Sequence, residues 1–171
     1  MEVLNYKDFR VTDEMLASKS KRFANYIIDT TLFYVLFFLL GGLLGIIAYV
    51  IGIEGLAEFL DKLENINSLL DRLITSVIFM FFYFILESIS QRTVGKLITQ
   101  SKVVLEDGTK PTPETIIIRS LCRIIPFEPL SFLGSTARGW HDSISKTYVV
   151  DTKIFEEQKK AYKDYYLIGK Q

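Results

Sequence analysis

Two long runs of apolar residues dominate the hydrophobic pattern of this chain of 171 residues. The first extends over about residues 23–52 with few polar interruptions, and the second covers about residues 73–90. A helix needs roughly 17–25 residues to cross the hydrocarbon core of a bilayer, so both runs are long enough to span it. The first run is also much longer than the core of a signal peptide. The pattern therefore predicts two transmembrane helices.

The segment between the two runs has the period of an amphipathic helix. Apolar residues recur on one helical face from Leu56 to Leu73, whereas the acids Glu58, Asp61 and Glu64 lie elsewhere. This pattern indicates a helix that lies on the membrane or extends the second span. A helix that binds a partner is the alternative.

A third apolar region, at about residues 113–134, is too charged for an ordinary lipid-facing span. It contains two arginines four residues apart, then two prolines and a glutamate, namely Arg119, Arg123, Pro126, Glu128 and Pro129. Charges in a bilayer are costly and proline breaks a helix. A bent helical segment that is re-entrant or interfacial fits better than one that spans.

Two short β-rich segments flank this third region, at residues 98–105 and 146–151. Neither is stable alone, so we expect them to pair, which returns the third region to the side from which it came. The predicted fold is an all-α membrane protein with a small cytoplasmic strand pair. It divides into an N-terminal segment (1–16), a membrane domain (17–151) and a basic tail (152–171).

Lysine and arginine are distributed unequally between the two sides. They flank the first run on its N-terminal side and follow the second, whereas Lys62 is the only basic residue in the acidic stretch from Glu54 to Asp71. Cytoplasmic loops carry the excess of positive charge. We therefore expect both termini to be cytoplasmic and the acidic loop to lie outside.

The composition argues against several function classes. The formal net charge is zero, so no overall field favours nucleic acid. With one cysteine, Cys122, and one histidine, His141, the chain lacks the ligands for a zinc cluster. It contains no glycine-rich phosphate loop and no nucleophile elbow. We expect no enzyme activity, no cofactor and no metal.

Two carboxylates inside the predicted spans need explanation. Asp29 lies in the first span and Glu87 near the end of the second. Arg119 and Arg123 are the natural partners, because guanidinium groups stay charged and bind carboxylates well, and Arg22 lies on the same helical face as Asp29. In one hypothesis these groups form a neutralised network that docks helices or a partner. In the other, Asp29 and Glu87 carry protons or Na⁺. Nearby arginines repel cations, which favours docking.

Three glycines suggest close packing. Gly41 and Gly45 form a GxxxG pattern in the first span, which is compatible with a homo-oligomer or a larger membrane complex. Gly95 precedes Lys96 and suits a tight reversal or a close helix contact.

Three stretches together resemble the RDD family of small bacterial membrane proteins. They are "KRFANYIIDTT", "SQRTVGKLITQSKVVLEDGTKPT" and "IIIRSLCRIIP…RGWHDSISKTYVV". Arg22, Asp29 and Asp142 match the arginine and the two aspartates of the family. The chain has Ser-Gln-Arg-Thr where many members carry a glycine before the glutamine. The resemblance implies a multi-pass protein of the bacterial inner membrane. It also implies a role in transport, such as sodium/proton antiport, or a role as an accessory domain.

Overall fold

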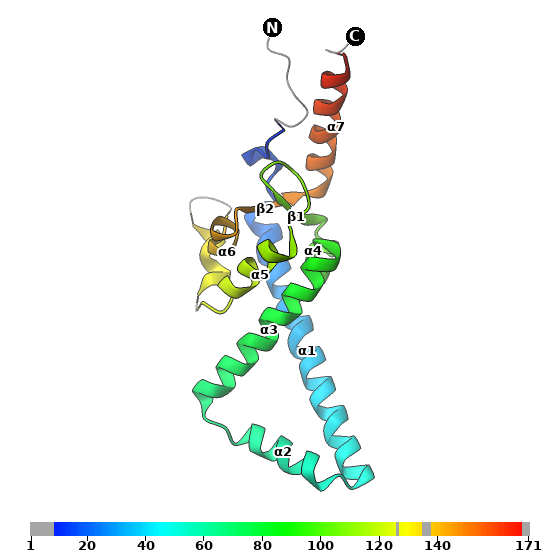
Figure 1. The fold of residues 1–171 in the computed structure, drawn as a ribbon, viewed down its shortest axis with the longest axis vertical. Helices are drawn as coiled ribbons and strands as arrows, with labels where there is room; N and C mark the ends of the chain where they lie inside the picture. The colour runs from blue at the N-terminus through cyan, green and yellow to red at the C-terminus, as the bar shows by residue number, and fades with distance from the viewer. Residues whose placement is uncertain (1–8, 126, 135–137, 169–171) are drawn as a thin grey trace.

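The computed structural model describes residues 9–125, 127–134 and 138–168. Two long helices, α1 (Lys19–Ile51) and α3 (Ser68–Ser90), lie together near one end and diverge toward the other, where α2 (Glu54–Glu64) joins them (Figure 1). The remaining elements of the membrane domain gather at the end where α1 and α3 meet. We call residues 94–151 the head; its elements are α4 (Val94–Ile98), β1 (Ser101–Leu105), α5 (Pro113–Cys122), η3 (Glu128–Leu133), α6 (Trp140–Ile144) and β2 (Thr147–Asp151).

Helices α1 and α3 are long and apolar enough to cross a membrane. At 1.5 Å per residue, the 33 residues of α1 extend over about 50 Å and the 23 residues of α3 over about 35 Å. Only 6% of the most apolar window of each helix is buried, whereas the core helix of a soluble protein would be covered by protein. The prediction of two membrane-spanning helices is supported, with α1 and α3 beginning a few residues earlier than the apolar runs.

Local signals define where the spans begin and end. The Ser18 hydroxyl accepts a hydrogen bond from the Lys21 amide at the start of α1, and the Asn67 side chain accepts one from Leu69 at the start of α3. Helix α1 ends at Gly52, which has a φ of 71°. Gln91 ends α3 with a φ of 60°, and this turn directs the chain back along the base of α1.

The third apolar region does not form a long helix in the described residues. Helix α5 has 10 residues, or about 15 Å, which is half the thickness of the hydrocarbon core. The region also contains η3, and α6 and β2 follow it in the chain (Figure 1). Pro126, predicted to interrupt this region, lies outside the described residues.

The two predicted strands pair as expected. β1 and β2 are antiparallel, with Ser101 opposite Asp151 and Leu105 opposite Thr147. Val103 and Val149 face one side with Ala17, and Val104 and Val150 face the other. The pairing places the chain before and after the third region on the same side of the spans.

Helix α7 (Thr152–Ile168) begins directly after β2 and points away from the spans (Figure 1). The Phe155 ring, in the first turn of α7, is buried against Phe9, with ring centroids 5.9 Å apart. Tyr162, further along α7, also packs against the Phe9 ring. The predicted basic tail is therefore a helix that extends outward from the sheet, at the opposite end of the molecule from α2.

Candidate functional site

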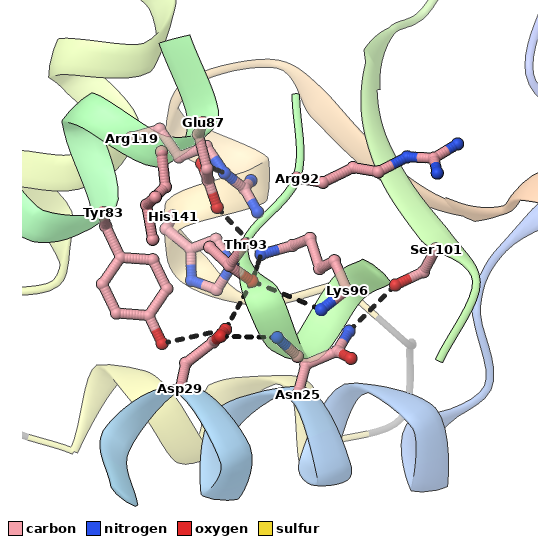
Figure 2. A network of polar contacts seen from close by, with 12 residues as sticks. Asn25, Asp29, Tyr83, Glu87, Arg92, Thr93, Lys96, Ser101, Arg119 and His141 are labelled. Carbon is pink, nitrogen blue, oxygen red and sulfur yellow. Dashed lines mark hydrogen bonds and ion pairs between the residues drawn. The ribbon is translucent and has the colours of Figure 1, made fainter. Parts of the chain in front are cut away.

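The first turns of α1 carry a buried polar face. Arg22, Asn25 and Asp29 follow one another at three- and four-residue spacing and are each at most 5% exposed. The side chain of Asn25 hydrogen-bonds with the hydroxyls of Ser101 (3.0 Å) and Thr99 (2.5 Å). Helix α4 and the start of β1 thus cover this face and shield it from lipid and water (Figure 2).

Asp29 is held by neutral donors. Its Oδ1 accepts a hydrogen bond from the Gly95 amide (2.7 Å), and Oδ2 accepts from the Thr93 hydroxyl (2.5 Å) and, more weakly, from the Tyr83 hydroxyl (3.4 Å) (Figure 2). Among the described residues, Asp29 makes no ion pair. Our expectation that an arginine partners Asp29 does not match this geometry, because Arg22 turns instead toward α6.

Glu87, near the end of α3, is surrounded by three cations. Its Oε1 contacts Lys96 Nζ at 2.8 Å and Arg123 Nη2 at 3.3 Å, and its Oε2 accepts from Arg119 Nε at 2.9 Å. The two arginines are the partners that the sequence suggests. Lys96 is an addition that sequence reasoning missed, because it lies outside both apolar runs and only the turn at Gln91 brings it back.

Asp142 joins the head to both spans. One of its oxygens binds Arg22 of α1, and the other binds Arg119, which also holds Glu87 of α3. Burial alone would lower the pKa of Arg119, but the carboxylates of Asp142 and Glu87 outweigh burial and raise that pKa. Burial alone would raise the pKa of Asp142, but His141 and the guanidinium groups of Arg22 and Arg119 outweigh burial and hold that pKa well below its usual range. Arg119 is therefore the centre of the site.

A second buried pair lies beside Asp142. His141 Nδ1 contacts Glu128 Oε1, and His141 Nε2 lies 3.5 Å from Arg22 Nη2. Burial, together with the nearby positive charges of Arg119 and Arg123, lowers the pKa of His141 to about 4. The imidazole is consequently neutral at pH 7, so Nδ1–H donates to Glu128 and Nε2 accepts from Arg22. Sequence reasoning treated His141 and Glu128 separately, since thirteen residues separate them.

These charges balance when His141 is neutral. We call the following set the polar network: the cations Arg22, Lys96, Arg119 and Arg123, the carboxylates Asp29, Glu87, Glu128 and Asp142, and His141. Four positive charges face four negative ones, which allows the network to be buried at moderate cost. Within the described ranges, no three His, Cys, Asp or Glu side chains are placed to hold a metal ion.

The comparison with known families covers the elements that build this network. A sequence model of the RDD family matches residues 16–150, from just before α1 to the end of β2. The chain belongs to the RDD family. No curated protein and no solved structure matches the chain. In this RDD protein, the arginine and the second aspartate of the family pattern, Arg22 and Asp142, bind each other, while the first aspartate, Asp29, binds α4.

The three glycines singled out in the RDD sequence have different surroundings. A Cβ at Gly95 would lie 2.7 Å from the Asn25 carbonyl oxygen and 2.9 Å from Asn25 Cα. Gly41 and Gly45 have nothing within 4 Å in this single chain. Only Gly95 is therefore in close packing here, where it brings its amide to Asp29.

We expect Gly95→Ala to lower the free energy of unfolding by about 1–3 kcal/mol, because backbone must move to admit the methyl group. Chemical unfolding in detergent micelles measures this change. Gly41→Ala is the matched control, and in open space it should leave the stability unchanged or raise it by up to about 1 kcal/mol. An equal effect of both substitutions would contradict the packing argument.

Proposed function

We propose that this RDD protein is a non-catalytic accessory or scaffold subunit of the membrane, in which the polar network docks the head onto the two spans. One observation carries the proposal. Both carboxylate oxygens of Asp29, of Glu87 and of Asp142 are occupied by donors from another element. Such saturation locks helices together, whereas a carrier must release one ligand for another during its cycle.

The network also supplies the link between segments far apart in the chain. Arg119 binds Glu87 and Asp142, which lie on α3 and α6, and Asp142 binds Arg22 on α1. Removing one partner of a buried ion pair leaves the other charge buried without compensation, which costs more free energy than the intact pair contributes. The ion pairs therefore hold these elements in one arrangement. A rigid head on two spans is a suitable platform for a larger membrane complex or for a second copy of the chain.

The second candidate is cation/proton antiport through Asp29 and Glu87. One observation favours it, namely that Asp29 has only neutral hydrogen-bond donors and therefore no fixed countercharge. The four cations within the network oppose it, because they raise the energy of a bound Na⁺ at this place.

A membrane placement follows from the exposed apolar surface of the head. Four apolar side chains of the third region and one of α6 are between 44 and 79% exposed, namely Ile117, Leu121, Phe127, Leu130 and Trp140. These side chains suit the interface of the bilayer, beside the ends of the spans, where α5 is too short to cross. We place the head on the cytoplasmic side of the bacterial inner membrane and α2 outside.

The topology predicts a defined labelling pattern. In a Cys122→Ser background, a cysteine introduced by Asp61→Cys in α2 should react with an impermeant maleimide added to intact cells. A cysteine introduced by Lys160→Cys in α7 should react only after the cells are opened. Both positions are exposed, so accessibility depends on the side of the membrane. The reverse pattern would invert the orientation, and external labelling at 160 alone would show that the third region crosses.

The substitution Asp29→Asn separates the two functions. Docking predicts a loss of about 1–3 kcal/mol in the free energy of unfolding, since the amide nitrogen of asparagine meets the donors of Thr93 or Gly95. Unfolding in detergent and Na⁺-driven proton movement in liposomes are measured on the same preparations. Asp71→Asn, at the exposed start of α3, is the control and should retain the stability of the wild type. An Asp29→Asn protein with unchanged stability that loses a flux present in the wild type would establish the carrier.

A further inference from the structure

A small cavity lies inside the polar network. Its volume is about 30 Å³, which is room for about two water molecules. Residues from α1, α3, α4, α5 and α6 line it, including four cations but only one carboxylate: Arg22, Lys96, Arg119, Arg123, Asp29 and His141. Figure 2 shows Arg119, Lys96 and His141 meeting at this place from three elements.

Arg119 and Arg123 each have one buried nitrogen that the hydrogen bonds and ion pairs among the described residues do not use. Arg119 uses Nε for Glu87 and Nη1 for Asp142 and Thr147, and its Nη2 is buried with no partner among the described residues. Arg123 uses Nη2 for Glu87 and lies with its Cζ 3.8 Å from the centre of the Tyr83 ring, and its buried Nε has no hydrogen-bond partner within that part of the chain. The side chains of Arg119 and Arg123 are 0 and 7% exposed.

The one carboxylate that lines the cavity already has hydrogen-bond donors on both oxygens. This carboxylate, Asp29, accepts hydrogen bonds from Gly95 and Thr93 outside the lining and from Tyr83 within it. The cavity therefore offers N–H donors and positive charge to its contents. A buried donor without an acceptor costs free energy, and an anion at this place satisfies two of them.

Charge balance indicates that a proton binds together with the anion. The network is neutral with neutral His141, so an added anion calls for one added proton. His141 lines the same cavity and is faced by Glu128 from η3, Asp142 from α6, Arg22 from α1, Arg119 from α5, and Arg123 directly after α5. Burial and the positive charges of Arg119 and Arg123 keep the pKa of His141 low. An anion beside these arginines offsets their repulsion of the imidazolium.

We propose that the cavity binds one halide-sized inorganic anion, such as chloride, through Arg119 and Arg123, together with a proton on His141. The volume selects this class, because sulfate, phosphate and the headgroup of a lipid are larger than the available space. The anion would bind nitrogens of Arg119 and Arg123 that the docking contacts do not use, so a failure of chloride binding would leave those contacts intact. By linkage, chloride favours protonation of His141 by the same factor by which the proton favours chloride.

The single histidine of the chain makes the test direct. The purified full-length protein, labelled with ¹⁵N-histidine, is titrated with acid in detergent in sodium chloride and in sodium gluconate at equal ionic strength. We expect the midpoint of His141 to lie about one pH unit higher in chloride, which corresponds to about tenfold coupling. We also expect chloride to raise the melting temperature more at pH 5 than at pH 7.

The other anions and three variants define the outcome. Sulfate and phosphate should behave like gluconate. Arg123→Gln should lose the chloride response, Arg123→Lys should weaken it, and Arg72→Gln, at the exposed start of α3, should retain it. Equal midpoints in chloride and gluconate for the wild-type protein would overturn the proposal and assign the cavity to water. An equal response to sulfate would also overturn it, because it would indicate surface screening.

Discussion

Replacing Arg119 by methionine should lower the free energy of unfolding by about 3–5 kcal/mol, the largest effect expected of any single substitution in the head. The guanidinium binds Glu87 and Asp142 at once, and both carboxylates are fully buried. Without it, two buried negative charges lose a shared countercharge. The loss is comparable with the total stability of many domains, so little folded protein should accumulate. Chemical unfolding in detergent and the yield of monodisperse protein measure the effect.

Two further substitutions test the reason for this loss. Arg119→Lys retains the positive charge but lacks the planar guanidinium group that binds two carboxylates at once, so we expect it to recover only part of the stability. Arg72→Gln removes an exposed arginine at the start of α3 and should change the stability little. An Arg119→Met protein as stable as Arg72→Gln would mean that the buried ion pairs do not hold the head on the spans.

Acid should destabilise the folded protein over a range defined by His141. Its pKa is about 4 in the folded protein, below the value near 6.5 of an unfolded chain. At pH 7 the imidazole is neutral in both states. As the pH falls from about 6.5 to 4, His141 becomes protonated in the unfolded state but stays mostly neutral in the folded state. The free energy of unfolding should therefore fall by about 3 kcal/mol. Unfolding by urea in gluconate buffers at several pH values measures this slope.

A His141→Gln variant should have a flatter stability profile between pH 6.5 and 4.5. Below that range, Asp142 and Glu128 add to the loss, because their pKa values are lowered in the folded state and the unfolded chain takes up their protons first. A wild-type slope that persists in the variant would assign the acid sensitivity to carboxylates and not to His141.

The sequence identified the elements whose causes are local. The spans follow from the length of two apolar runs, and the strands follow from short β-rich segments that need a partner. Asp29 and Glu87 stood out because a carboxylate in an apolar helix needs compensation whatever the fold. Arg119 and Arg123 lie four residues apart in an apolar region, and this pattern predicted that they bind the two carboxylates, which is correct for Glu87 but not for Asp29.

The partner of each charge was decided by the tertiary structure. The Gly95 amide that holds Asp29 carries no sequence signal, because nearly every residue has such a donor and only the lack of a side chain allows the approach. Lys96 reaches Glu87 only because the chain reverses at Gln91. Arg22 binds Asp142 across 120 positions of the chain. An apolar run determines its own environment, whereas a buried charge takes whichever donors the packed elements bring within reach.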